Sequence, residues 1–328
     1  MVGQDLLDVV FSVPRTPDGR LDLLGAQFVN RPYAAHTRGD TAAIIAHFNP
    51  AGWKKPPKLL YDTCEALLVS GAHIVVVQLM AHDATPAAVP PGVTNVVYRS
   101  NAVLFHKENL FNLGVQHTDA AKFMFLDGDL IFSRSDIFDA VSLALDACHV
   151  LQPYQVCAWL DAENSVFLTR QSAADGIKHD IAPIPGHVHP GFAWAMTRQF
   201  YDNIGGLYDR HPLGSGDTAL SFALFRGEPP FPVIANDAFV FTPSWGAFRE
   251  RVQTCKPVVG VVPGALYHLW HGTREKRQYA ERWRYLPVAQ GDEYPLQRRE
   301  DGVLEWTNPA HSEVLRNYFL SRDEDHEA

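Results

Sequence analysis

The sequence has few cysteines, no long apolar run and no overall positive charge, and each shortage argues against a class of protein. Its four cysteines are scattered and form no C-x-x-C pair, which argues against a disulfide framework and a zinc knuckle. No apolar run approaches the roughly 18 residues that a membrane span needs. The first residues, MVGQDLLDVV, place no basic segment before an apolar stretch, so we expect no signal peptide. We therefore expect a cytoplasmic protein without a membrane segment.

The charge balance argues against a protein that coats nucleic acid. The net charge is −9 over 328 residues, but it is unevenly spread. Between Gly246 and Arg299 ten Lys and Arg residues stand against five acids. Such a local surplus either meets a phosphate-bearing partner or lies on a solvated helical face.

The stretch Lys122–Phe132, KFMFLDGDLIF, is the most informative part of the chain. Its apolar and aromatic residues predict a buried strand that carries Asp127 and Asp129. Side chains alternate along a strand, so both carboxylates would point to the same side, where they can hold a cation such as Mg²⁺ beside a diphosphate. The alternative is a tight hairpin, because Asp-Gly is a strong turn signal.

The order of the remaining segments predicts an α/β fold with a mainly parallel sheet. Apolar, β-branched runs alternate with segments of helical spacing, which is typical of βαβ units. Polar residues 161–186 predict a long mobile loop, and residues 322–328 predict an acidic tail that is not ordered. The expected strands are 42–48, 73–79, 94–98, 122–132 and 149–159, and the expected helices are 58–70, 105–117, 135–147, 197–204 and one that opens at Asp217.

Two further clusters carry groups that suit a ligand site. Leu213–Asp217, LGSGD, opens an apolar helix, and its glycines allow close backbone approach while Asp217 can lie at the floor of a pocket. The alternative for Asp217 is a helix N-cap. The stretch GALYHLWHG presents His268 and His271, which suit a metal such as Mn²⁺. In a strand only one of them would face the site, in a helical turn both would, and an isolated pair is also common as a structural feature.

Together these clusters resemble the GT-A class of nucleotide-sugar-dependent glycosyltransferases. The resemblance covers about residues 42–284 and is closest to family-2-like enzymes and to the C-terminal half of the β-galactosyl/GalNAc-transferase group. Similar chains with HLWHG followed by R-x-Y-x-x-R are common in phage and bacterial genomes. The matching segments are the helix with Lys107 and Asn112, Asp127-Gly128-Asp129, HPGFAWA with GGLYD, Gly214–Asp217, His268–Gly272, and Arg277, Tyr279 and Arg282.

The resemblance implies a domain plan, a cofactor and roles for individual residues. A GT-A-like (Rossmann-like) domain would span 41–284, between an N-terminal segment 1–40 and a C-terminal extension with the acidic tail, 285–328. Mn²⁺ or Mg²⁺ would bridge protein and donor, which we expect to be a UDP-sugar. The implied roles are metal binding for Asp129 with His268 or His271, donor binding for Asp127, His47, Phe48, Asn49, Lys107 and Asn112, and general base for Asp217.

The pattern departs from its relatives at one place, and three functions remain open. Many relatives have an acidic pair where this chain has Asp217 followed by Thr218, which leaves the base and the stereochemistry undecided. The basic stretch 246–299 and the phage-like relatives favour an enzyme that glycosylates hydroxymethylpyrimidines in DNA, in the host cytoplasm if phage-encoded. Overall acidity favours a glycan, lipid-linked sugar or small acceptor. The third alternative is a nucleotide-sugar binder without turnover.

Overall fold

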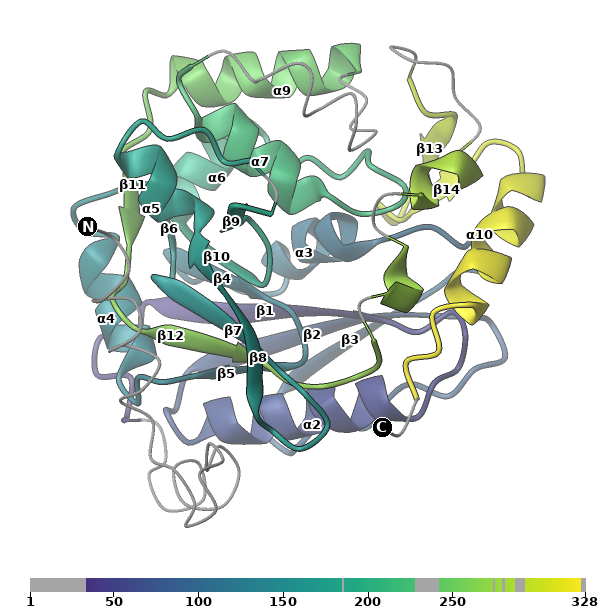
Figure 1. The fold of residues 1–328 in the computed structure, drawn as a ribbon, viewed down its shortest axis with the longest axis horizontal. Coiled ribbons are helices and arrows are strands. Elements are labelled where there is room, and N and C mark those ends of the chain that lie inside the picture. The colour runs from purple at the N-terminus through teal and green to yellow at the C-terminus, as the bar shows by residue number, and fades with distance from the viewer. Residues whose placement is uncertain are drawn as a thin grey trace.

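The computed structural model describes residues 34–184, 186–227, 242–273, 275–278, 281–286 and 293–325. Of the predicted N-terminal segment 1–40, residues 1–33 lie outside these ranges, as do Arg274 and Tyr279 of the basic stretch. Figure 1 shows two sheets, with helices α6, α7 and α9 on one side of the larger sheet and α2 on the other. Among the described residues, no helix is both long and apolar enough to cross a bilayer.

The larger sheet is mixed and mainly parallel, as expected. Its strands lie in the order β11-β6-β10-β4-β1-β2-β3. Four pairings are parallel, and only β10 runs antiparallel to its neighbours β4 and β6. The α/β prediction is therefore confirmed. The strand bounds are β1 Thr41–Phe48, β2 His73–Met80, β3 Thr94–Arg99, β4 Lys122–Leu126, β6 Val150–Gln152, β10 Ala193–Thr197 and β11 Val259–Val261.

A second sheet of five strands, in the order β5-β12-β7-β8-β9, packs beside the first. In it, β12 runs parallel to β7 and antiparallel to β5. Leu130 and Phe132 of β5 and Leu266 of β12 belong to the same apolar cluster as the larger sheet's Ile45 and Met124. The bounds are β5 Leu130–Phe132, β7 Val156–Leu160, β8 Val166–Ser172, β9 Val188–His189 and β12 Ala265–His268.

The central strands send alternate side chains into two cores, as a period of two requires. Ile44, Val75 and Phe123 join the core under α3, α6, α7 and α9. Their neighbours Ala43, Ile74 and Met124 join the core with α2 and α4. The helix bounds are α2 Lys55–Leu68, α3 Lys107–Val115, α4 Ile137–Ala144, α5 Ala173–Lys178, α6 Arg198–Ile204, α7 Gly216–Leu224, α9 Pro243–Thr254 and α10 Ala310–Leu320, with short 3₁₀ turns η1 Glu275–Arg277 and η2 Arg282–Tyr285.

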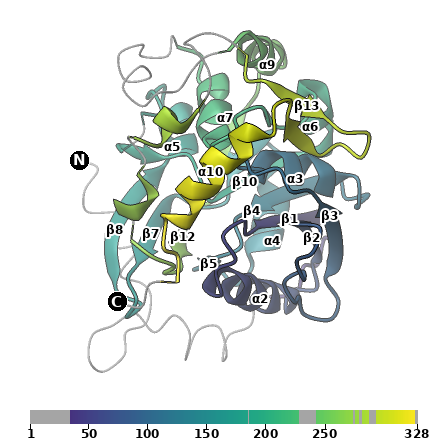
Figure 2. The same ribbon diagram turned by 90° about the vertical axis from the view of Figure 1, so that its right-hand side faces the viewer.

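The C-terminal part packs on the rest of the molecule through its own apolar cluster. The hairpin of β13 (Leu296–Arg298) and β14 (Leu304–Trp306) and helix α10 supply Trp306, Leu315 and Phe319. These pack with Leu104 and Leu213 of the preceding chain. Figure 2 shows α10 crossing the face of the molecule that looks toward the viewer. The domain boundary predicted at residue 284 stays a prediction.

Several predicted elements differ from the structure. The strand expected over 122–132 is interrupted at 127–129, and its halves β4 and β5 belong to different sheets. The strand expected over 149–159 likewise divides into β6 and β7. The predicted loop 161–186 contains β8 and α5, so that prediction was wrong. The predicted acidic tail is placed as far as residue 325.

Candidate active site

The Asp127-Gly128-Asp129 segment follows β4, at the point of the larger sheet where the strand order reverses. β4 ends at Leu126, beside Ile45 of the parallel strand β1, which continues to Phe48. From β1 the sheet continues to β2 on one side and to β4 on the other. In open α/β sheets ligands bind in the crevice at this point. Because β4 and β5 pair with different strands, the hairpin alternative is wrong.

Backbone contacts fix the segment tightly. The Asp127 N–H donates to Phe192 O at 2.9 Å, and the Leu269 N–H donates to Asp129 O at 2.9 Å. Thr63 Oγ1 donates to Gly128 O at 3.2 Å. The first contact binds the segment to the chain before β10, the second to the chain after β12, and the third to α2. The two carboxylates are thus held separately, and they have different neighbours.

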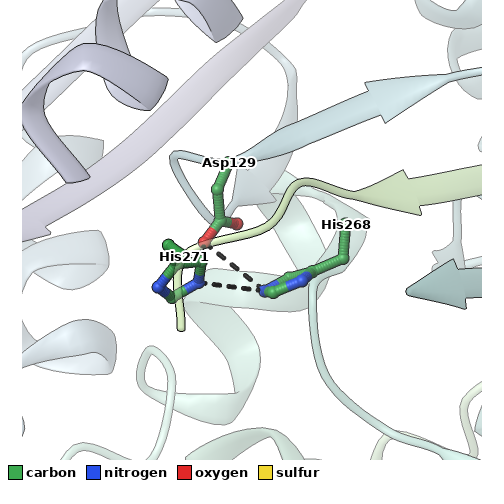
Figure 3. Close-up of side chains that lie close together, drawn as sticks. All are labelled: Asp129, His268 and His271. Carbon is green, nitrogen blue, oxygen red and sulfur yellow. Dashed lines mark hydrogen bonds and ion pairs between the residues drawn. The ribbon is translucent and has the colours of Figure 1, made fainter. Parts of the chain in front are cut away.

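Asp129 faces His268, the last residue of β12, and His271, which follows that strand (Figure 3). His271 Nε2 lies 2.8 Å from Asp129 Oδ2, and His268 Nε2 lies 3.5 Å from the same oxygen. The two Nε2 atoms are 3.2 Å apart. His268 is the last residue of the strand, and His271 lies in the chain that follows it. Both histidines therefore reach the site, although within a strand only one of them would. These three are the group among the described residues whose ligand atoms could share a metal.

This trio fits a divalent cation. Ligands at about 2.1 Å from an octahedral ion are about 3 Å from one another, which matches the separations of 2.8, 3.2 and 3.5 Å. Asp129 Oδ1 is buried and has no hydrogen-bond partner among the described residues, although buried polar atoms are normally satisfied. Two imidazoles beside one carboxylate suit Mn²⁺ better than Mg²⁺, which prefers oxygen ligands.

The protonation tendencies of Asp129 and His268 favour metal binding, whereas burial and Arg277 are outweighed at His271 by Asp129 and Glu324, which raise its pKa. Burial would raise the pKa of Asp129, but His268, His271 and Arg277 outweigh it and hold the pKa well below its usual range. Burial lowers the pKa of His268 well below its ordinary value. Metal binding requires a deprotonated carboxylate and a neutral imidazole, and these two residues provide both.

Asp127 belongs to a second group, with Lys107 and Asp217. The Lys107 ammonium lies 3.4 Å from Asp127 Oδ1 and 3.3 Å from Asp217 Oδ2. Burial and the charges of Asp129 and Asp217 outweigh Lys107 and raise the pKa of Asp127. Burial also acts to raise the pKa of Asp217, but Lys107, His189 and the Thr218 N–H outweigh it and lower that pKa. Asp217 is therefore the carboxylate of the pair with the lower pKa, and Asp127, with a pKa of about 6, is the first of the two to take up a proton as pH falls.

Asp217 is not the N-cap of α7. The cap position is held by Ser215, in a left-handed conformation with φ of 70° and without a side-chain capping bond. Asp217 lies inside the first turn, and its Oδ2 is close to Gly191, where a Cβ would come within 2.7 Å of it and within 2.9 Å of His189 Nε2. Gly191 thus leaves room for both side chains beside the cavity.

Both groups line one cavity of about 520 Å³. This volume falls in the range of small-molecule sites. Phe48, Phe105 and Phe319 of the lining are in mutual ring contact and define what we call the aromatic end. Trp159, Val188 and His189 also line the cavity. The lining further includes His47, Pro50, Trp53 and Pro56.

The structure brings most of the predicted donor residues to this cavity, with two exceptions. His47, Phe48, Lys107 and Asp127 line it. Asn49 does not, because its side-chain amide donates to Trp53 O at 2.6 Å and accepts from the Trp53 N–H. Asn112 also lies away from it and binds both the N–H and the C=O of Leu207. Both asparagines hold backbone in place.

Four charged cavity residues were not predicted as site residues, Arg277, Arg282, Arg322 and Glu324. Arg277, from η1, lies against His271, with 2.7 Å between its terminal nitrogen and His271 Nε2. Arg322 and Glu324 reach the cavity from the chain after α10. Arg277 belongs to the R-x-Y-x-x-R pattern that carries the resemblance, so the sequence contained a signal for it. Glu324 lies in an acidic terminal segment whose local pattern does not indicate a long-range contact, so it could not be found from the sequence.

The basic stretch does not form an open cationic face over its described residues. Six of its ten cations donate to groups of the protein itself. The two lysines, Lys256 and Lys276, are exposed. The engaged cations are Arg249 on Gly227 O, Arg251 on Ile204 O, Arg277 on His271, Arg282 on Ser215, Arg298 on Asp209 and Arg299 on Glu305.

No protein-family model matches the sequence, and no curated protein matches it. Many solved structures match the chain, and three of them illustrate the extent of the match. The catalytic domain of Drosophila β1,4-galactosyltransferase 7 with xylobiose matches with 11% identity and a TM-score of 0.34, over 68% of this chain and 64% of that one. Mycobacterium tuberculosis glucosyl-3-phosphoglycerate synthase with Mn²⁺, UDP-glucose and phosphoglyceric acid matches with 12% identity and a TM-score of 0.39, over 75% of this chain and 77% of that one. S. aureus TarS 1–349 with UDP matches with 11% identity and a TM-score of 0.35, over 57% of this chain and 55% of that one. This chain therefore spans less than two thirds of the galactosyltransferase domain and of the TarS fragment. Similarity of this degree assigns no activity to the chain.

Proposed function

We propose that the protein is a metal-dependent glycosyltransferase that moves a hexose from a nucleotide-sugar, a UDP-sugar, to an acceptor hydroxyl. One observation carries the proposal: a single cavity holds the Asp129–His268–His271 cluster next to the Lys107–Asp127–Asp217 group, with an aromatic end beside them. Mn²⁺ and UDP also occur in compared structures, but the argument rests on the side chains.

The metal cluster would hold the donor's diphosphate. Asp129, His268 and His271 would ligate Mn²⁺, which when bound supplies charge stabilisation for the leaving diphosphate. His47 and Phe48 would contact the base, and Asp127 would accept a hydrogen bond from a ribose hydroxyl. Lys107 keeps its positive charge despite burial, because Asp127 and Asp217 raise its pKa.

Asp217 would act as the general base. Its lowered pKa keeps it ionised at neutral pH, so that it can accept the proton of the acceptor hydroxyl. The hydroxyl oxygen then bonds to the anomeric carbon while the bond from that carbon to the diphosphate breaks, which would invert the anomeric centre. A positioned base of this kind contributes typically about 10²–10⁴-fold to the rate.

The metal assignment is tested by Asp129→Ala. We expect the variant to lose Mn²⁺-dependent UDP binding and transfer while folding normally, because the carboxylate is a ligand and not a packing element. Calorimetry of UDP with Mn²⁺ and with EDTA measures this, and Asp202→Ala, an exposed acid on α6, is the control. Equal UDP affinity with and without metal would contradict the assignment.

The acceptor proposal is hydroxymethylpyrimidine in DNA. It rests on the basic stretch of the sequence. In the described part of that stretch, most arginines donate hydrogen bonds to groups of the protein itself. Phosphate contacts need free cations and make binding fall steeply with salt, so Lys256, Lys276 and residues outside the described ranges would have to supply them. A glycan or small hydroxyl acceptor needs no such surface and is the second candidate.

The two acceptor classes are separated by one assay. The protein is incubated with Mn²⁺, UDP-sugars and DNA that contains 5-hydroxymethylcytosine or 5-hydroxymethyluracil, and the digested nucleosides are weighed by mass spectrometry. A nucleoside heavier by one hexose supports DNA. Donor consumption without a modified nucleoside supports the glycan or small-molecule acceptor.

A further inference from the structure

The chain after α10 returns to the metal cluster, although its composition predicts a solvated tail. Figure 1 shows the yellow chain leaving α10 and running down to α2. Glu324 is buried, with a side-chain exposure of 7%, and its Oε2 lies 3.3 Å from His271 Nδ1. An acidic side chain is almost never buried without a partner. Here the partners are the Arg322 guanidinium, which forms an ion pair with Glu324, and the His271 ring, whose other nitrogen faces Asp129.

Asp325 anchors this segment to the start of α2. Its carboxylate accepts from the backbone N–H groups of Lys54 and Lys55 at 2.8–2.9 Å. Lys54 occupies the N-cap of α2 and provides no side-chain cap, so Asp325 satisfies donors that the helix itself leaves open. The segment is therefore fixed on both sides of Glu324, by α10 before it and by α2 after it.

The turn after His271 is shaped to receive the segment. Gly272 has φ of 100°, and a Cβ there would come within 2.8 Å of Asp323 O and 3.2 Å of Glu324 Cα. Arg322 places its guanidinium over the rings of Trp53 and Phe319, at 6.0 and 5.5 Å. Arg322 and Glu324 line the cavity together with Trp53 and Phe319, so the segment is part of the cavity wall.

The hydrogen-bond roles around His271 determine which nitrogen can bind a metal. A carboxylate such as Glu324 accepts, so the Nδ1 that faces it carries the hydrogen. Arginine only donates, and Arg277 lies 2.7 Å from Nε2, which agrees with a lone pair on Nε2. That nitrogen and Asp129 Oδ2 are 2.8 Å apart, so both could ligate one cation.

We propose that Glu324 is a positioning residue of the metal centre, so that the C-terminal segment 322–325 is an integral part of the metal site. This inference rests on the proposed metal-dependent function. A carboxylate on the outer nitrogen of a metal-bound histidine fixes the ring and its tautomer, and loss of such a partner typically weakens metal binding by about 10–100-fold. By linkage, metal binding must in turn order the segment.

The test compares the Glu324→Ala and Glu324→Gln variants with the unsubstituted 328-residue chain. Mn²⁺ affinity is measured by the loss of the free-ion electron paramagnetic resonance signal, with and without UDP. We expect a loss of about 10–100-fold for Glu324→Ala and a smaller loss for Glu324→Gln, whose amide oxygen can still accept from Nδ1–H. Glu313→Ala, on α10 with a side-chain exposure of 71%, removes the same charge away from the cavity and should change nothing.

A second measurement excludes a purely structural effect. Because Glu324 acts through an imidazole, its loss should reduce affinity for Mn²⁺ more than for Mg²⁺, whereas general loosening would weaken both alike. In the wild type, Mn²⁺ should also slow hydrogen exchange in 322–325 and at the start of α2. If the wild type binds Mn²⁺ and both Glu324 variants bind it equally well, the inference fails and the metal centre stands. If the wild type binds no Mn²⁺, both fail.

Discussion

The two aspartates of the 127–129 segment show how one motif divides into two chemical roles. Asp129 meets two imidazoles and its pKa falls, whereas Asp127 meets Lys107 and two other acids and its pKa rises. The sequence argument placed both on one side of a strand. The structure places Gly128 between them in a turn whose two ends enter different sheets, and this separation lets each carboxylate serve a different neighbour.

At Asp217 we expect a catalytic effect without a structural one. Asp217→Asn should lower turnover about 10²–10⁴-fold and leave UDP affinity and the melting temperature nearly unchanged, because Ser215 holds the cap position and Asp127 still faces Lys107. Steady-state kinetics and thermal melting measure the two effects. Asp202→Asn is the matched control.

The opposite pattern at Asp217 would remove the base assignment. If the variant melts at a lower temperature and keeps its turnover, the carboxylate has only a structural role in the first turn of α7. The pKa direction adds a further expectation. Since the pKa of Asp217 is lowered, this residue should produce no loss of turnover between pH 5 and 7.

At the scale of elements, a charged cluster joins the start of β1 to β4 and α4. Asp40 accepts from Lys122 Nζ at 2.8 Å and from Ser142 Oγ at 2.6 Å. Burial would raise the pKa of Asp40, but these hydrogen bonds outweigh it and lower the pKa from 3.8 to about 2. A carboxyl group with a lowered pKa stabilises the folded state above its unfolded pKa, and that stabilisation is lost as pH falls through the folded value.

We therefore expect Asp40→Asn to lower the free energy of unfolding by about 2 kcal/mol at pH 7, since one pKa unit corresponds to about 1.4 kcal/mol. The difference from wild type should shrink between pH 4 and pH 2. Urea unfolding at several pH values measures it, with the exposed Asp119→Asn as control. A difference in the free energy of unfolding that does not change with pH would mean that the ionised state of the Asp40 carboxylate is not what stabilises this cluster.

The sequence predicted elements well where packing is local and poorly where a run crosses between sheets. β1, β2 and β3 are apolar or β-branched runs bounded by polar residues, and their predicted bounds agree closely with the structure. β8 was missed because most of its side chains are only partly buried, which leaves little apolar signal in the run VFLTRQS. The break at 127–129 was missed because β4 and β5 are both fully buried.

The site follows the same rule. Asp129, His268, His271 and Asp217 stand in local motifs, and the structure gathers them in one cavity. Glu324 stands in no motif and reaches His271 only because α10 folds over the cavity. Its role depends on contacts between segments about 50 residues apart, and no local pattern carries that information.

At the scale of the whole molecule, the cavity joins parts that the sequence divides. Its wall combines Phe48 of β1, Trp159 of β7, Asp217 of α7 and Phe319 of α10, so both sheets and the C-terminal part contribute. The cluster around Trp306 and Phe319 also contains Leu104 and Leu213. A ligand in this cavity contacts every part at once, and we expect it to stabilise all of them together.

Mn²⁺ with UDP should therefore raise the temperature of one cooperative unfolding transition. At about 100 times the dissociation constant, binding contributes about 2.7 kcal/mol, which in a chain of 328 residues corresponds to a rise of roughly 4 °C. Differential scanning calorimetry measures it, and Asp129→Ala, which should lose the rise that depends on metal, is the control. If residues 285–328 formed a separate unit, a second transition that does not respond to the ligand would appear. Its appearance would contradict a C-terminal part that belongs to the site, because a segment holding Glu324 against His271 cannot unfold independently of a bound metal.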